Sequence, residues 1–147
     1  MYDYHTHSSF SDDGHTPIKE MIEAAWKLGI KEIAITDHFD PDYPDPDYPF
    51  ILDFPEYHKA LEDAKDTYRD RIKVIKGIEM GIQHGDTLDQ CIESAKAYDY
   101  DFIIGSFHCA EGKDLSSRSF FKGRSPEDAY LAFYTYMLDC LKRYKEY

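Results

Sequence analysis

The 147-residue sequence has few cysteines and no long apolar run. Its three cysteines, Cys91, Cys109 and Cys140, form no Cys-x-x-Cys pair and are odd in number, which argues against a disulfide framework and favours a reducing compartment. No apolar stretch is long enough to span a bilayer, and the N-terminus lacks the basic and apolar segments of a signal peptide. We therefore expect a cytoplasmic protein without a membrane partner.

Positive charge is also scarce. Lysine and arginine number 17 against 29 acidic residues, a formal net charge of −12. This balance argues against non-specific binding to nucleic acid or anionic membranes, and bound cations could neutralise part of it. The length suits about one domain but falls short of the roughly 200 residues that a typical complete (β/α) barrel needs.

Short apolar runs that end in polar residues predict buried strands at 31–38, 72–79 and 100–108, with a further strand before His5. Between them, apolar residues at helical spacing predict helices at 17–28, 55 to about 69, 88–98 and 126 to about 143. The last of these should bury Tyr130, Phe133, Met137 and Leu141. Strand followed by helix, four times over, predicts an α/β fold with a parallel sheet or barrel wall of about four βα units.

Helix-capping residues support these bounds. Thr16 with Pro17 should start the first helix, Asp53 or Phe54 the second, Thr87 with Gln90 as a capping box the third, and Ser125 the fourth. Two longer connections, 39–53 and 109–124, both follow strands and should lie at the carboxyl edge of the sheet, here called the rim. The second connection is basic, through Lys113, Arg118, Lys122 and Arg124, and would complement a phosphate.

Metal-ligand side chains follow or close each predicted strand. His5 and His7 follow the first strand, and His38, Glu79 and His108 end the other three. Because the carboxyl ends of parallel strands meet at one rim, we expect these side chains to converge. A mixture of imidazole and carboxylate suits Zn²⁺, Mn²⁺ or Fe²⁺ better than Mg²⁺ or Ca²⁺. A carboxylate such as Glu79 can bridge two ions, and two-metal sites typically activate water for phosphoester hydrolysis.

Each position also has an ordinary structural explanation. His5 and His7 could be exposed residues near the terminus, Asp37 and His38 could cap a loop, Glu79 could pair with Lys76 or another rim lysine, and His108 could be a core histidine. Four such coincidences at four equivalent strand ends favour the metal site instead. His84 could contact a substrate or a metal ligand, whereas His15 and His58 are expected at the surface or in packing.

The ordered motifs His5-Thr6-His7, Ser11-Asp12-Asp13-Gly14, Thr36-Asp37-His38, Gly77-Ile78-Glu79 and Gly105-Ser106-Phe107-His108 resemble the PHP family, named for polymerase and histidinol phosphatase. Segments 111–115 and 120–123 look more like its histidinol-phosphate phosphatase branch than its DNA-polymerase branch. The resemblance implies a distorted, TIM-like barrel of seven strands that holds up to three divalent ions. It also implies hydrolysis of a small phosphorylated metabolite, L-histidinol phosphate, to L-histidinol in histidine biosynthesis.

The resemblance assigns roles to residues. His5 and His7 would bind a first ion, Glu79 would bridge it to a second held by His108, and His38 with an aspartate of the turn would hold a third. Spacing in the phosphatase branch favours Asp13 for that aspartate, while the commoner family spacing favours Asp12, so both stay candidates. Glu79 and His108 are the expected catalytic residues, and Lys113, Arg118 and His84 the expected substrate-binding residues.

The resemblance also implies further ligands from the family's C-terminal half, in a Gly-His motif and an Asp-x-His pair, and this sequence ends at Tyr147 before that half. We therefore expect one PHP domain over 1–147, truncated on its C-terminal side, with activity in its intact form and a homo-oligomer covering the open half-barrel. The alternatives are a PHP phosphoesterase that acts on nucleotides or oligonucleotides, and a metal-binding half-barrel without catalysis.

Overall fold

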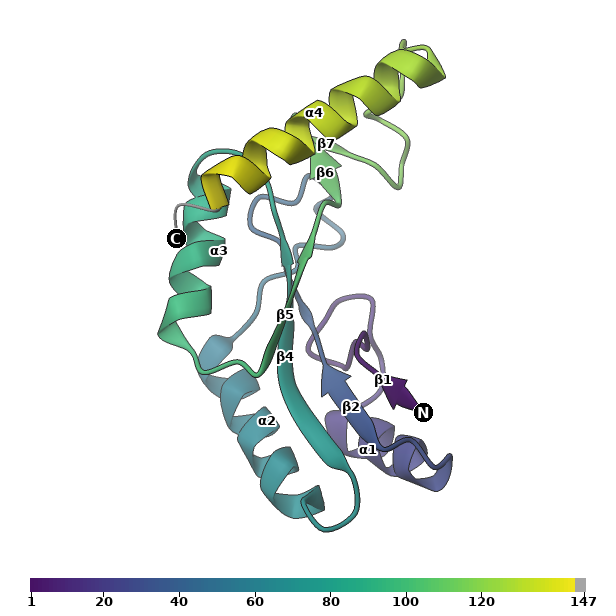
Figure 1. The fold of residues 1–147 in the computed structure, drawn as a ribbon, viewed down its shortest axis with the longest axis vertical. Coiled ribbons are helices and arrows are strands. Elements are labelled where there is room, and N and C mark those ends of the chain that lie inside the picture. Colours follow the sequence, from purple (N-terminus) through teal and green to yellow (C-terminus); the bar gives the residue numbers. More distant parts are fainter. Residues whose placement is uncertain (145–147) are drawn as a thin grey trace.

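A parallel sheet runs through the computed structural model, which describes residues 1–144 (Figure 1). Its strands alternate with helices, so the four predicted βα units are confirmed. The strands of the sheet are β1 (Tyr2–Asp3), β2 (Glu32–Ile35), β3 (His38–Phe39), β4 (Lys73–Gly81) and β5 (Phe102–Ser106). The helices are α1 (Ile18–Lys27), α2 (Phe54–Tyr68), α3 (Asp86–Ala97) and α4 (Pro126–Tyr144).

Strand β4 is the centre of the sheet, because β2 and β3 both pair with it along one edge and β5 pairs with its other edge, all in parallel. The single strand predicted at 31–38 is therefore wrong in one respect. It is interrupted at Thr36 and Asp37, since the Asp37 N–H donates to the Tyr57 hydroxyl instead of to β4, although Asp37 O still accepts from Glu79 N. After this break β3 resumes the pairing with His38 directly opposite Glu79.

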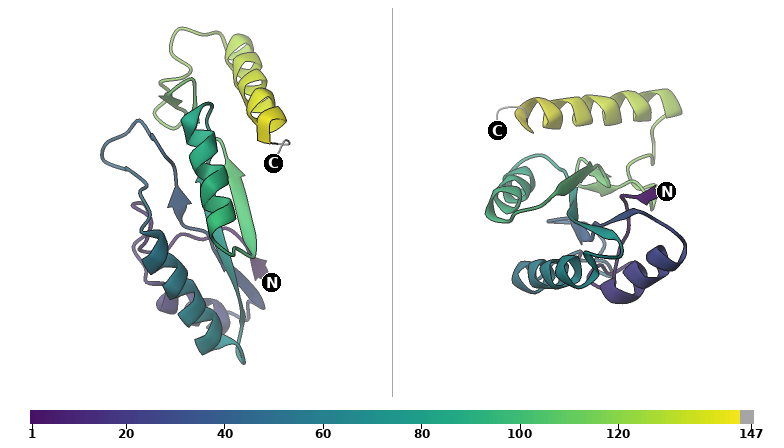
Figure 2. Two further views of the ribbon diagram at one scale, coloured as in Figure 1. Left: turned by 90° about the vertical axis from the view of Figure 1, so that its left-hand side faces the viewer. Right: turned by 60° about the horizontal axis from the view of Figure 1, so that its bottom comes forward.

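Helices α1 and α2 lie side by side on one side of the sheet, and α4 lies on the opposite side (Figure 2). Helix α2 turns Tyr57, Leu61, Ala64 and Tyr68 inward, one residue per turn, so a single apolar stripe faces β4. Together with residues of β2 and β4 these side chains form the main core, in which Ile35 and Ile78 are fully buried. This core fixes the strands whose ends carry the candidate ligands.

Two of the predicted helix starts are confirmed and two are wrong. Asp53 accepts a hydrogen bond from Glu56 N, and Ser125 accepts one from Asp128 N, as capping residues do. In α1 the N-cap is Pro17, one residue beyond Thr16, and no side chain caps the helix. Helix α3 starts at Asp86 after Gly85, whose φ of 80° suits glycine, and the Thr87 hydroxyl donates to Asp42 instead of forming a capping box.

The connection 109–124 holds an antiparallel hairpin that the sequence pattern does not show. Its strands, β6 (Cys109–Ala110) and β7 (Lys113–Asp114), have two residues each, too few for a periodic signal. In α4 the expected inward face is only partly correct, because Ala129 and Cys140 are buried and Phe133 is half-buried while Tyr130 and Leu141 are exposed. Within residues 1–144 none of the helices is long and apolar enough to cross a membrane.

Removal of the Tyr57 hydroxyl tests this packing. The hydroxyl of this fully buried residue accepts from Asp37 N at 3.1 Å and lies 2.9 Å from Gly77 O, so it links α2 to the break after β2 and to β4. Tyr57→Phe should lower the free energy of unfolding by about 1–3 kcal/mol, because it leaves buried backbone groups without partners. Urea denaturation measures the loss, and Tyr48→Phe, at a residue 44% exposed, is the matched control. Equal stability of the two variants would contradict this account.

Candidate metal centre

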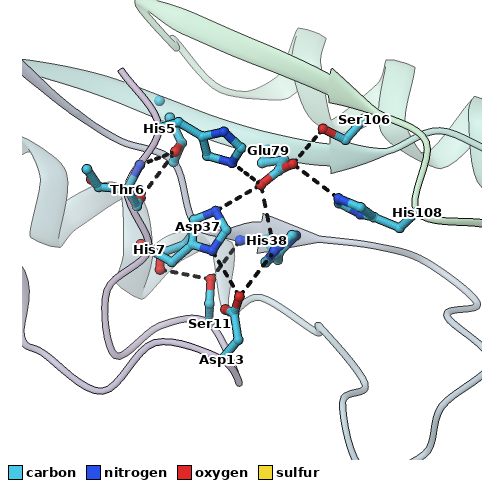
Figure 3. A network of polar contacts seen from close by, with 12 residues as sticks. His5, Thr6, His7, Ser11, Asp13, Asp37, His38, Glu79, Ser106 and His108 are labelled. Atoms are coloured by element: carbon cyan, nitrogen blue, oxygen red, sulfur yellow. Dashed lines mark hydrogen bonds and ion pairs between the residues drawn. The ribbon is translucent and has the colours of Figure 1, made fainter. Parts of the chain in front are cut away.

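The Glu79 carboxylate, 1% exposed, lies at the meeting point of four segments (Figure 3). Its Oε2 atom is 2.8 Å from His5 Nε2 and 2.9 Å from His7 Nε2. Its Oε1 atom is 3.2 Å from His108 Nε2 and accepts a hydrogen bond of 2.5 Å from Ser106 Oγ. One carboxylate therefore joins imidazoles that follow β1 and β5.

Asp13 and His38 extend this arrangement. Asp13 Oδ2 is 3.0 Å from His7 Nδ1 and 3.6 Å from His38 Nε2, which is itself 3.6 Å from Glu79 Oε2. The six side chains, here called the Glu79 cluster, form three groups whose ligand atoms lie within 4.8 Å of one another: His5, His7 and Glu79; His7, Asp13 and His38; and His38, Glu79 and His108. The structure thus brings together six of the seven residues expected to bind metal.

The donor set and its spacing fit divalent ions. Two atoms that each lie about 2.1 Å from one tetrahedral Zn²⁺ are about 3.4 Å apart. The separations in the Glu79 cluster, from 2.8 to 3.6 Å, bracket that value. Nitrogen and carboxylate oxygen in one site suit Zn²⁺, Mn²⁺ or Fe²⁺.

The pKa values of the Glu79 cluster indicate that its buried carboxylate requires positive charge beside it. Hydrogen bonding to Glu79 raises the pKa of His7 to about 9. Burial opposes the charged form of His108, but hydrogen bonds to Asp40 and Glu79 outweigh it and raise its pKa to about 10. Burial likewise opposes ionisation of Glu79, yet hydrogen bonds from His108, His7 and Ser106 hold its pKa well below the usual range. Without an ion, protonated His7 and His108 balance the buried carboxylate, and a divalent cation supplies the same kind of charge.

The turn that carries Asp13 is fixed from beneath by Asp37. This buried carboxylate accepts hydrogen bonds from Ser8 N at 2.6 Å, Ser8 Oγ at 2.8 Å and Ser11 Oγ at 2.9 Å, although burial raises its pKa. Gly14 closes the turn, since a Cβ there would lie 1.9 Å from Ser8 O. The turn therefore bends back tightly enough to bring Asp13 over the rim.

Asp12 lies outside the Glu79 cluster. Its Oδ2 atom accepts a hydrogen bond of 2.8 Å from Phe50 N. Phe50 has a φ of 45°, and its ring lies against that of His38 with a centroid distance of 4.4 Å. Of the two aspartates left open by the sequence, Asp13 contacts the histidines and Asp12 anchors the loop between β3 and α2.

Two residues of this region were not singled out from the sequence. Asp40, 1% exposed, lies between His38 and His108, whose hydrogen bonds lower its pKa although burial opposes ionisation. Ser106 lies inside a motif quoted for His108 and donates to Glu79. The sequence shows that Asp40 follows His38 by two residues, but only the folded structure shows that Asp40 is buried.

The expected substrate contacts remain apart from the Glu79 cluster. His84 is exposed, and its ring packs edge-on against Tyr136 at 4.5 Å. Lys113 and Arg118 are exposed in the hairpin region, and within residues 1–144 no hydrogen bond or ion pair joins them to the Glu79 cluster. The ion pair of Glu79 with Lys76, offered as an alternative, is wrong, because Lys76 pairs with Glu62 at 2.5 Å and Asp99 at 3.3 Å.

Three known proteins resemble this chain over most or nearly all of its length. A probable histidinol-phosphatase of Clostridium acetobutylicum is 31% identical over 97% of the chain and 52% of its own length. The histidinol-phosphatase of Lactococcus lactis is 30% identical over 99% of the chain and 53% of its own length. The DNA polymerase/3'-5' exonuclease PolX of Bacillus subtilis is 32% identical over 72% of the chain but 18% of its own length.

A solved structure gives the same result. The crystal structure of histidinol phosphate phosphatase from L. lactis, complexed with zinc, L-histidinol and phosphate, superposes with a TM-score of 0.88 and 27% identity over 99% of this chain and 55% of that one. The parallel α/β fold expected for the PHP family is therefore confirmed over that half. The chain spans about half the length of the histidinol-phosphatases it matches. The PHP domain model matches residues 3–146, and the chain belongs to the PHP family.

Proposed function

We propose that the intact protein is a metal-dependent phosphomonoester hydrolase that converts L-histidinol phosphate to L-histidinol and phosphate. The observation that carries this proposal is the Glu79 carboxylate, which is shared by two of the three groups of potential ligands. A buried carboxylate between imidazoles suits the bridging position of a two-metal site, which typically serves phosphoester hydrolysis. The L. lactis enzyme, complexed with zinc, L-histidinol and phosphate, supports the substrate class.

In this proposal the Glu79 cluster holds up to three Zn²⁺, Mn²⁺ or Fe²⁺ ions. His5 and His7 hold the first with Glu79, Glu79 and His108 the second, and His38 with Asp13 the third. When bound, such ions supply the activation of water and the neutralisation of phosphoryl charge that the hydrolysis needs.

The chain's own side chains prepare this chemistry. Ser106 Oγ donates to Glu79 Oε1 and fixes the plane of the carboxylate, so that its other oxygen faces His5 and His7. Glu79 and His108 are catalytic residues in this scheme through their contact with the reacting centre. The exposed Lys113, Arg118 and His84 would bind the phosphate of the substrate.

Two alternatives have support of their own. The similarity to PolX, which covers 106 residues, keeps a PHP phosphoesterase acting on nucleotides or oligonucleotides open. The coverage of about half of the histidinol-phosphatases keeps open a metal-binding half-barrel without catalysis.

Replacement of Glu79 tests the proposed reaction. Glu79→Gln should lower phosphate release from L-histidinol phosphate by more than about 100-fold, a greater loss than removal of a ligand's outer partner usually causes. A chelator should abolish release by the unmodified protein, and Zn²⁺ or Mn²⁺ should restore it. The exposed Glu93→Gln on α3 is the control and should keep full activity.

The same assay separates the alternatives. A preference for a nucleotide over L-histidinol phosphate would overturn the substrate assignment. Stoichiometric bound metal with no turnover of any phosphomonoester would support the non-catalytic half-barrel.

The two turn aspartates provide a matched pair for metal binding. Asp13→Asn should reduce the number of zinc ions bound per chain, because it removes the carboxylate next to His7 and His38. Asp12→Asn should keep the metal and lower only the free energy of unfolding, by about 1 kcal/mol, because its partner is Phe50 N. Elemental analysis and urea denaturation measure the two effects, and the reverse pattern would make Asp12 the ligand.

We also propose that the protein forms a homo-oligomer through the outer face of α4. Leu131, Tyr134 and Leu138, exposed by 68%, 60% and 52%, form an apolar stripe on that face. In residues 1–144, β5 also leaves the edge away from β4 without a partner strand, which favours association.

Light scattering tests the oligomer. The unmodified chain should have a mass at least twice its monomer mass of 17.2 kDa, and Leu131→Lys with Leu138→Lys should lower it to the monomer value by placing charge in the interface. Leu28→Lys, at a leucine 77% exposed at the end of α1, on the opposite side of the sheet from α4, is the matched control. A monodisperse 17.2 kDa species for the unmodified chain would contradict the proposal.

A further inference from the structure

Asp40 is a buried carboxylate that contacts two histidines of the Glu79 cluster at once. Its Oδ1 atom is 2.6 Å from His108 Nδ1 and its Oδ2 atom is 3.0 Å from His38 Nδ1. The two imidazoles come from different strand ends, and their ring centroids are 4.9 Å apart. Each oxygen of Asp40 thus serves one ring, and neither histidine has a second partner on its Nδ1 atom among the described contacts.

The opposite nitrogens of these rings face the cluster. His108 Nε2 is 3.2 Å from Glu79 Oε1, and His38 Nε2 is 3.6 Å from both Glu79 Oε2 and Asp13 Oδ2. A neutral imidazole has one proton, so a carboxylate that accepts it from Nδ1 leaves the Nε2 lone pair available to a cation. Asp40 therefore selects, for both rings, the tautomer that can bind metal.

Gly81, the last residue of β4, provides the space for this carboxylate. A Cβ at Gly81 would lie 1.9 Å from Asp40 Oδ1 and 2.3 Å from its Cγ, closer than any non-bonded contact allows. Gly81 is not among the residues with positive φ, so space and not backbone conformation demands glycine here. The position of the Asp40 carboxylate thus depends on a glycine 41 residues further along the sequence.

We propose that Asp40, seated against Gly81, is a positioning residue that orients His38 and His108 together and so couples two ion sites of the Glu79 cluster. The inference rests on the metal-dependent function proposed above. It adds a residue that binds no ion itself, and it predicts that after Asp40→Asn only one of the two histidines can keep the tautomer that binds metal.

Asp40→Asn separates this role from a general loss of structure. An asparagine can accept from one ring with its carbonyl oxygen, but its NH₂ group must donate to Nδ1 of the other ring. That ring then has its proton on Nε2 and loses its lone pair for the cation. We expect zinc affinity, measured by titration calorimetry on the purified protein, to fall about 10–100-fold. Asp114→Asn, at a buried carboxylate bonded to Tyr43 and to the 116–117 segment, is the control and should keep the affinity.

A second background makes the test specific. In His38→Ala protein, the asparagine introduced by Asp40→Asn can turn its carbonyl oxygen to His108, so this substitution should cost several-fold less zinc affinity there than in the unmodified protein. An equal cost in both backgrounds would mean a merely structural role and would overturn the proposal. In ¹⁵N spectra of the histidine-labelled, zinc-loaded Asp40→Asn variant, one of the two rings should change from the Nδ1–H to the Nε2–H tautomer.

Gly81→Ala gives an independent result that leaves Asp40 in the sequence. It should lower zinc affinity in the same direction, because the new methyl group displaces the carboxylate, and it decides the matter if Asp40→Asn does not fold. Gly105→Ala on β5, where a Cβ would meet only the movable end of Ile82, is the control. Unchanged zinc binding in Asp40→Asn or Gly81→Ala would overturn this inference but not the proposed function. An unmodified protein that binds no zinc would overturn the proposed function as well.

Discussion

A carboxylate buried in the central strand is the constraint around which the rest of the molecule is arranged. Glu79 is 1% exposed, and removing an ionised carboxylate from water is costly unless positive charge lies beside it. The chain meets this need with imidazoles from the segments after β1 and β5 and from β3. The strand order, with β4 between β3 and β5, gives these residues access to the same side chain. The order of the strands in the sheet therefore also determines which side chains surround Glu79 in the candidate site.

Much of this arrangement could be predicted, because its signals are local. Apolar runs that end in His38, Glu79 and His108 located the strands, and the rule that parallel strands meet at one rim brought their ends together. Asp53 and Ser125 marked helix starts correctly because a cap depends on residues three positions away. The PHP motifs added the turn with Asp13, which the structure brings to His7.

The remainder depends on contacts between distant residues. Nothing near Asp40 in the sequence indicates that it touches His108, which is 68 residues away, or that Gly81 makes room for it. Asp12 is bonded to Phe50 N, 38 residues beyond it in sequence, and this contact keeps Asp12 away from the histidines that Asp13 contacts. The break at Thr36 and Asp37 arises from the Tyr57 hydroxyl, and the two-residue strands β6 and β7 are too short to have a periodic pattern.

Strand β3 has a consequence for how the chain folds. It forms two residue pairs with β4 in the same register as β2, so one register of pairing with β4 places both strands. A slip of one residue would turn His38 to the opposite face of the sheet, away from Glu79. An ion held by side chains from His5 to His108 would therefore penalise every misaligned pairing and close loops of up to about a hundred residues in a single event. The occupant of the Glu79 cluster would thus select the correct register of the sheet in addition to the role proposed for it in hydrolysis.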